Sequence, residues 1–181
     1  RVVLNGWSLG GAVVVEAARN LGDTCAGLVL TCGATPAYLQ KPDYPHGGTE
    51  EVLAETLAAM NADRINFLAA LAQGVCATEI SQEQIHWMWR IFTEASPMAA
   101  QTLGELGPLD QRDILAQLSM PILSFVGAYD AVVDPAICRS VKVINPAARL
   151  VEMADSGHAP FIDETAKYNS KLVAFCKECM G

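Results

Sequence analysis

The stretch that decides the fold is Gly6-Trp7-Ser8-Leu9-Gly10-Gly11. An apolar run, Val2 to Leu4, precedes it, and a helix-like run, Ala12 to Arg19, follows it. This arrangement predicts a nucleophile elbow, in which a serine sits on a sharp turn between a strand and a helix. Such a turn strains the serine backbone, and we expect that side chains at Gly6 and Gly10 would collide with the neighbouring strand and helix. The serine hydroxyl should therefore stand clear of the sheet.

The runs around this stretch predict a parallel sheet. A second apolar run, Ala26 to Thr31, follows the helix, and strand-helix-strand at this spacing is typical of a βαβ unit. Two more strands are expected at Pro121 to Gly127 and Arg149 to Met153. A helix from about Pro135 to Val143 should join them, and a closing helix should run from Phe161 to Cys179. The sequence therefore predicts an α/β fold with a mostly parallel sheet.

Residues 36–118 contain no convincing strand. Helices are expected at 49–72, as one or two helices, and at 81–95, 97–106 and 110–118. Thr49 is a candidate cap, and Ser81 with Gln84 forms a capping-box pattern. An insertion of helices between strands of a parallel sheet is most simply a lid over the carboxyl ends of the strands. We therefore expect a helical lid at 36–118 on a core of residues 1–35 and 119–181.

Composition excludes several classes of partner. The 181 residues carry a net charge of −8, which argues against nucleic acid and anionic membrane surfaces as partners. No apolar run approaches the roughly 20 residues that a membrane span needs. The six cysteines have no disulfide-framework spacing, so we expect reduced, mostly buried thiols and a cytoplasmic protein. The Cys176-x-x-Cys179 pair lies in the closing helix without a second pair, and we assign it no function.

Two later loops carry residues that suit a nucleophilic serine. Asp130 follows the third predicted strand and His158 follows the fourth. Because parallel strands end at one edge of the sheet, both should lie beside Ser8. Histidine is the side chain that takes a proton near neutral pH, and a carboxylate on its far nitrogen fixes the tautomer. The residues predict a triad in which Ser8 attacks, His158 moves the proton and Asp130 orients His158.

Other residues compete for these roles. Asp134 precedes Pro135 and is expected to cap a helix, and Asp155 is expected to be a solvated turn residue, so Asp130 is preferred. His46 is expected in an exposed loop and His86 on the lid surface or in packing. With three histidines in the chain, no metal cluster has plausible ligand spacing.

The surroundings of the serine suggest further site residues. The Leu9 N–H, at the start of the helix, is the candidate for one oxyanion donor. Trp7, Trp87, Trp89 and Phe92 are candidates for substrate binding. The apolar side of the lid could line an acyl pocket or could merely pack on the sheet, and both can hold for different members: Met60, Trp87, Met88, Trp89, Phe92 and Met98.

Three blocks resemble the catalytic blocks of the serine α/β-hydrolase superfamily. They are Gly6 to Gly11, Gly127-Ala-Tyr-Asp130-Ala-Val-Val133 and Gly157-His158-Ala-Pro-Phe161. The nearest resemblance is to small bacterial carboxylesterases, particularly pimeloyl carrier-protein methyl ester esterases. The tryptophan beside the serine and the His-Ala-Pro-Phe-Ile run suggest that group.

The resemblance implies that this chain matches the second half of the fold. In that superfamily the nucleophile follows the fifth strand of an eight-stranded sheet. The remaining part would carry the other oxyanion donor and the strand that pairs with Val2 to Leu4. We therefore expect an unpaired apolar sheet edge here, and poor activity from the 181 residues alone.

Charge bears on the expected substrate. Residues 36–118 hold eleven acidic and four basic side chains, which is −7 of the total −8. The acyl carrier protein that the resembling esterases imply is itself acidic, and like charges suppress such an encounter. We therefore expect a small ester or acyl substrate rather than one bound to acyl carrier protein.

The predicted function is hydrolysis of a carboxylic ester through an acyl-enzyme, without a cofactor. The same triad could open a lactone, hydrolyse a C–C bond or perform cofactor-free perhydrolysis, and these alternatives stay open. A non-catalytic protein that uses the hydrolase cavity to bind a ligand is the alternative from another class.

Overall fold

The computed structural model describes all 181 residues and centres on a parallel sheet of four strands. Their order in the sheet is the order in the chain: β1 (Val2–Trp7), β2 (Cys25–Thr31), β3 (Ile122–Gly127) and β4 (Arg149–Met153). In register, Trp7 pairs with Thr31, and Thr31 pairs with Phe125. The strand ends that carry the predicted site residues therefore lie side by side, as the sequence predicts.

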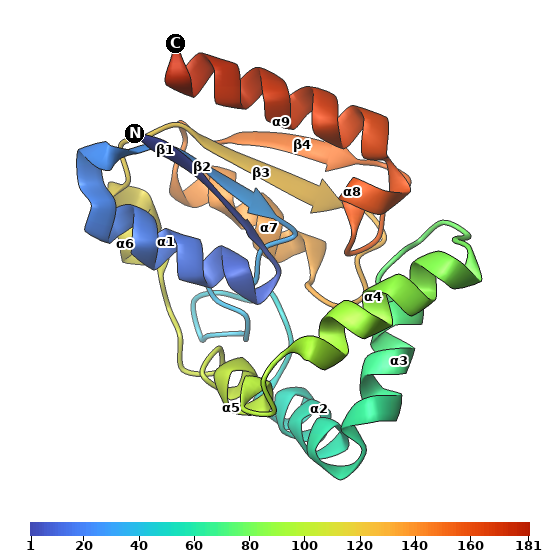
Figure 1. Ribbon diagram of the computed structural model, residues 1–181. Coiled ribbons are helices and arrows are strands. Elements are labelled where there is room, and N and C mark those ends of the chain that lie inside the picture. Colours follow the sequence, from blue (N-terminus) through green and yellow to red (C-terminus); the bar gives the residue numbers. More distant parts are fainter.

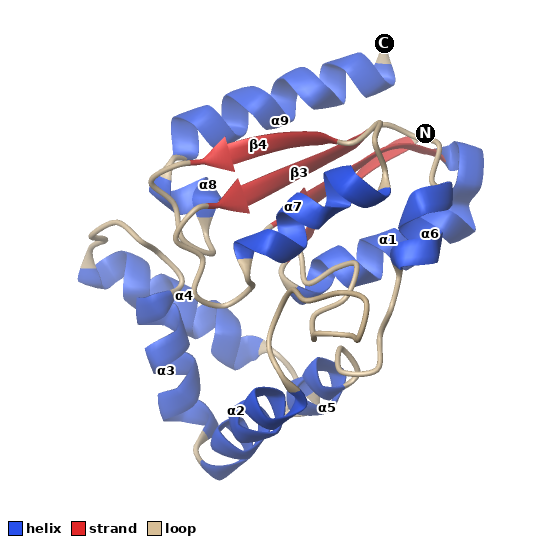
Figure 2. Ribbon diagram, turned by 180° about the vertical axis from the view of Figure 1, so that it is seen from behind, coloured by secondary structure: helices blue, strands red, loops and turns tan.

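Helices cover both faces of the sheet (Figure 1). On one face lie α1 (Leu9–Leu21), α6 (Arg112–Gln117) and α7 (Pro135–Ile144), which bury Val15, Leu115 and Val141 against β2 and β3. Figure 2 shows these helices below the sheet, with α9 above it. The other face is covered by α9 (Thr165–Met180), whose Phe175 packs with Phe125.

Burial explains why the strand sequences differ. Every residue of β2 and β3 is buried, as expected for central strands covered on both faces. By contrast, β1 lies at the edge of the sheet, and Val2 is 43% exposed there. The unpaired edge at β1 is the one that the sequence predicts.

A helical segment separates β2 from β3, as predicted for residues 36–118. It begins with a loop, continues through α2 (Glu50–Ala62), α3 (Arg64–Gly74), α4 (Gln82–Glu94) and α5 (Ala99–Gly104), and ends with α6. In Figure 1, α2 to α5 lie beyond the carboxyl ends of the strands. None of the helices in the protein combines the length and the apolar composition needed to cross a membrane.

The predicted caps define the helices of this segment. The Thr49 hydroxyl accepts from Val52 N at the start of α2, and the Ser81–Gln84 capping box is complete at the start of α4. Asp63 ends α2 and caps α3 by accepting from Asn66 N. The 49–72 stretch is therefore two helices, one of the two alternatives that the sequence left open.

Gln111 ties this segment to the core at its base. The residue is fully buried, its N–H donates to Pro36 O, and its amide oxygen accepts from the Thr35 hydroxyl. The amide nitrogen donates to Ala12 O at 2.9 Å and to Glu16 at 3.2 Å. The two ends of the insertion are thereby joined to each other and to α1. After this point α6 packs against α1 and α7.

The prediction of one closing helix from Phe161 to Cys179 is wrong. The chain forms a short helix, α8 (Pro160–Asp163), and then α9, with a break at Glu164. Glu164 leaves helical geometry with φ −125° and ψ 50°. Its carboxylate accepts from Asp155 N and the Ser156 hydroxyl. These bonds to the preceding loop fix the bend, which helical periodicity alone cannot reveal.

Candidate active site

Ser8 occupies a strained turn between β1 and α1. Its φ of 57° lies in the left-handed region, which costs a non-glycine residue on the order of 1–3 kcal/mol. Three backbone hydrogen bonds hold it there: Ser8 N donates to Thr31 O at 3.1 Å, and Ser8 O accepts from Gly11 N and Ala34 N at 2.8 Å each. The hydroxyl does not cap the helix and makes no hydrogen bond within the protein, so it is available to react.

The glycines that this turn requires are only partly those that the sequence predicts. A Cβ on Gly6 would collide with the Gly10 carbonyl oxygen and lie 2.5 Å from Val14 Cγ2, which confirms the requirement for Gly6. The prediction for Gly10 is wrong, since a Cβ there meets nothing within 4 Å. Gly11 is the second constrained position, because its Cβ would lie 2.7 Å from Gly33 Cα. The close approach joins α1 to the loop after β2 and is invisible without the tertiary structure.

The Leu9 N–H is free at the start of α1. As the first residue of the helix it has no partner within that helix, and it donates to no other group of the protein. A free N–H next to a nucleophilic serine is the geometry of an oxyanion donor.

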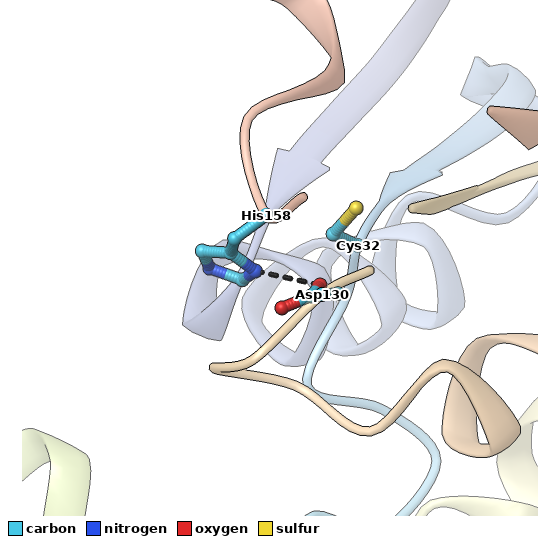
Figure 3. Close-up of side chains that lie close together, drawn as sticks. All are labelled: Cys32, Asp130 and His158. Carbon is cyan, nitrogen blue, oxygen red and sulfur yellow. Dashed lines mark hydrogen bonds and ion pairs between the residues drawn. The ribbon is translucent and has the colours of Figure 1, made fainter. Parts of the chain in front are cut away.

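His158 and Asp130 form a buried pair (Figure 3). His158 Nδ1 lies 2.8 Å from Asp130 Oδ2, and the two side chains are only 3% and 1% exposed. The other oxygen of Asp130 accepts from Val132 N and Val133 N at 2.9 Å each. The carboxylate is therefore held in place by its own loop and directed at the imidazole. No hydrogen bond joins the Ser8 hydroxyl to His158 in this structure.

The competing acids and histidines lie elsewhere. Asp134 caps α7 by accepting from Ala136 N and also accepts from Gly47 N, so its carboxylate has a structural role. Asp155 is exposed. His46 packs edge-on against Tyr44, with ring centroids 4.9 Å apart, and His86 is exposed beside Trp89. Only Asp130 meets a histidine.

Aromatic side chains surround His158. The Trp7 indole donates to His158 O at 2.7 Å, and its ring centroid lies 5.2 Å from the imidazole. Trp7 also stacks on Phe92 of α4 at 6.1 Å and meets Phe161 of α8 edge-on at 5.1 Å. Trp7 and Phe92 therefore lie at the site, and their role in substrate binding stays a prediction.

The other two predicted aromatics lie differently. Trp89 shares the packed face of α4 with Ile85, Met88 and Phe92, and its indole donates to Ile65 O. Trp87 is 55% exposed and lies on the opposite face of α4. The structure does not bring Trp87 to the site. Of the apolar residues expected on the inner side of the segment, Met98 is also exposed, whereas Met60 and Met88 are buried in packing.

Cys32 is a neighbour of the site that sequence reasoning missed. It follows β2, is fully buried, and has a positive φ of 45°. Its sulfur lies within 4.8 Å of a carboxylate oxygen of Asp130 and of a ring nitrogen of His158 (Figure 3). The sequence could have indicated Cys32, because this residue directly follows a predicted strand and so lies at the same sheet edge as Ser8.

Cys32, Asp130 and His158 offer a thiol, a carboxylate and an imidazole, the kinds of groups that bind zinc. Burial, together with the charge of Asp130, raises the pKa of the Cys32 thiol, which favours the protonated form that does not ligate metals. Asp130 and His158 already satisfy each other. These three side chains are therefore better described as a hydrogen-bonded Asp130–His158 pair beside a protonated thiol than as a metal centre.

These parts can perform covalent chemistry. A free serine hydroxyl, a buried carboxylate–imidazole pair and a free helix N–H meet at one sheet edge. The imidazole can accept a proton through Nε2 while the carboxylate stabilises its positive charge. The free N–H can stabilise an oxyanion formed next to the serine.

The fold and this site define a class of protein. Residues 1–165 match the model of the family described as the alpha/beta hydrolase fold, and the chain belongs to that family.

Particular relatives are similar over most of this chain. The AB hydrolase superfamily protein YisY of Bacillus subtilis is 30% identical over 175 residues, covering 96% of this chain and 65% of its own. A pimeloyl-[acyl-carrier protein] methyl ester esterase of Nitrosomonas europaea is 29% identical over 164 residues, covering 87% of this chain and 64% of its own. The solved esterase EaEST of Exiguobacterium antarcticum superposes with a TM-score of 0.92 at 26% identity, over 97% of this chain and 66% of its own. The chain thus spans about two thirds of the length of the relatives it matches.

Proposed function

We propose that this chain carries the catalytic triad of a serine esterase that works through an acyl-enzyme. Ser8 attacks the ester carbonyl while His158 takes its proton, and Asp130 fixes the imidazole and stabilises its charge. The Leu9 N–H donates to the oxyanion of the tetrahedral intermediate. His158 then returns the proton to the leaving alcohol, and water releases the acid by the same steps. The buried His158–Asp130 pair beside a strained Ser8 is the observation that carries the proposal.

Names of relatives support the reaction class. Esterases occur among both the curated relatives and the solved structures similar to this chain. The tryptophan and phenylalanine side chains around His158 supply an apolar wall suited to an acyl group.

The charge of the helical segment supports a small substrate. Each of its four basic side chains already contacts a group of the protein. Arg112 binds Asp43 and Asp110, Arg64 donates to Ala95 O, and Lys41 donates to Gly107 O. Arg90 lies 3.9 Å from Glu94. We propose a free ester as the substrate, because an acidic carrier protein would meet a surface with a large excess of negative charge.

Fluorophosphonate labelling tests the triad. The probe phosphonylates an activated serine, and peptide mass spectrometry locates the adduct. We expect the adduct on Ser8 in the wild-type chain and none in His158→Ala, while the exposed Ser96→Ala control labels normally. A folded wild-type chain that stays unlabelled, or an adduct on another serine, would overturn the proposal. Hydrolysis of an ester series with increasing acyl length then measures substrate size.

A further inference from the structure

Asp163, the last residue of α8, binds two segments that are far apart in the sequence. One carboxylate oxygen accepts from Gly157 N at 2.8 Å and from Ala77 N at 3.1 Å. The other accepts from Thr78 N at 3.0 Å and from the Thr78 hydroxyl. Four donors thus converge on one carboxylate, and hydrogen bonds to an ionised acceptor are stronger than neutral ones.

The two segments also touch each other directly. Residues 75–78, the elbow between α3 and α4, lie against residues 156–159, the His158 loop. Ala159 N donates to Val75 O at 2.9 Å, and both residues are buried in one cluster. A Cβ on Gly157 would lie 2.9 Å from Ala77 N, so only glycine allows this approach. The Asp163 carboxylate spans a junction that is already tightly packed.

The negative charge of Asp163 also affects the Cys76 thiol in this elbow. Burial and, after it, the negative charge of Asp163 together raise the pKa of the Cys76 thiol to about 12. The carboxylate therefore acts on the elbow through both hydrogen bonds and charge.

His158 lies in the middle of this junction. The N–H of the residue before it donates to Asp163, and the N–H of the residue after it donates to Val75 O. Its own carbonyl accepts from the Trp7 indole. The backbone before and after His158 is therefore held by the Asp163 carboxylate and by the elbow, and the direction of the imidazole toward Asp130 depends on that backbone.

We propose that Asp163 is a positioning residue for His158: by joining the α3–α4 elbow to the His158 loop, it holds the imidazole in line with Asp130. The inference rests on the proposed function for its kinetic consequence, because only an active triad makes the position of His158 rate-determining. The helical segment thereby becomes part of the catalytic framework through its elbow.

Asp163→Asn tests the proposal with Asp155→Asn as its matched control. Both variants remove one negative charge from the same region, but the exposed Asp155 carboxylate makes none of these bonds. An amide keeps one acceptor oxygen and turns an NH2 group toward backbone donors. We expect kcat/KM and the Ser8 labelling rate to fall by about tenfold or more in Asp163→Asn, mainly through kcat. Asp155→Asn should match the wild type.

The Nδ1–H proton of His158 gives a readout that does not depend on activity. In the wild type this proton is shared with Asp130 and shielded by burial, so NMR should show it as a slowly exchanging downfield signal. We expect it to broaden or shift in Asp163→Asn and to stay unchanged in Asp155→Asn. Thr78→Val removes one elbow donor and serves as a milder second variant if Asp163→Asn does not fold.

The outcomes separate the two proposals. An unlabelled wild type with an Nδ1–H signal that responds to Asp163→Asn would overturn the esterase proposal and support the positioning role. A folded Asp163→Asn protein with an unchanged signal and unchanged labelling rate would overturn the positioning role alone. A loss of rate with an unchanged Nδ1–H signal would also overturn it, because the effect would then not pass through His158.

Discussion

His158 Nδ1 and Asp130 Oδ2 lie 2.8 Å apart in a buried site, whereas the neighbouring Asp134 points its carboxylate at the start of α7 and at Gly47. The two acids are four positions apart in the sequence but do different work. The loop after β3 directs Asp130 at a histidine, while Asp134, just before Pro135, caps a helix as the sequence predicts.

Substitution of these two acids gives the first prediction. Asp130→Asn keeps the shape of the side chain but removes the charge that stabilises the imidazolium, so kcat should fall by about 10³-fold or more. Asp134→Asn should leave kcat within about twofold and cost at most ~1 kcal/mol of stability through the α7 cap. Steady-state ester hydrolysis and thermal unfolding measure the two effects. Equal losses of kcat in both variants would contradict the assignment of Asp130.

Adjacent glycines give the second prediction. Gly11→Ala should lower the free energy of unfolding by about 1–3 kcal/mol, because its Cβ would press on Gly33. Gly10→Ala has open space around the new Cβ and should be neutral or stabilise α1 by up to ~1 kcal/mol. Urea denaturation of the two variants checks the difference. If Gly10→Ala is the more damaging change, the contact assigned to Gly11 is wrong.

Gln111 gives a third prediction, on how the helical segment is attached. Gln111→Ala leaves the buried Thr35 hydroxyl without its acceptor and opens a cavity, so the free energy of unfolding should fall by about 2–4 kcal/mol. Gln117→Ala, an exposed position on α6, should change it by less than ~0.5 kcal/mol. Denaturant titration monitored by tryptophan fluorescence measures both. A fall in Gln111→Ala no larger than in the control would exclude the anchoring role.

Cys76 gives a prediction on pH dependence. Because burial and Asp163 raise the pKa of its thiol to about 12, the thiolate is scarce at pH 8 and increases only as the pH rises toward that value. Alkylation by iodoacetamide at pH 8 should therefore be at least about tenfold slower than for the same cysteine in the unfolded chain. Peptide mass spectrometry follows the reaction at Cys76.

The Asp163→Asn variant tests the effect of Asp163 on this thiol. It removes the negative charge that raises the pKa of Cys76, so alkylation should become faster. Asp155→Asn should alkylate at the wild-type rate. A rate in Asp163→Asn equal to the wild type would show that the charge of Asp163 does not reach the thiol.

The local pattern of the sequence was enough to predict the strands and the starts of two helices. Apolar runs located all four strands, and the Ser81–Gln84 box and Thr49 located two helix starts. The βαβ spacing predicted parallel strands, and parallel strands end at one edge. For that reason Ser8, Asp130 and His158 could be assigned to one site before any coordinate was known. These features depend on residues close together in the chain, whose backbone geometry their own side chains dictate.

Contacts between distant segments were decided only by the tertiary structure. The approach of Gly11 to Gly33, the place of Cys32 beside Asp130, and the bonds from Asp163 to Thr78 each join residues more than twenty positions apart. The exposure of Trp87 likewise depends on which face of α4 packs against the rest of the protein. No periodicity encodes such pairs, because they arise when packed elements bring side chains together in space. The sequence alone therefore determined which residues form the triad we propose, and the packing decided what holds them in place.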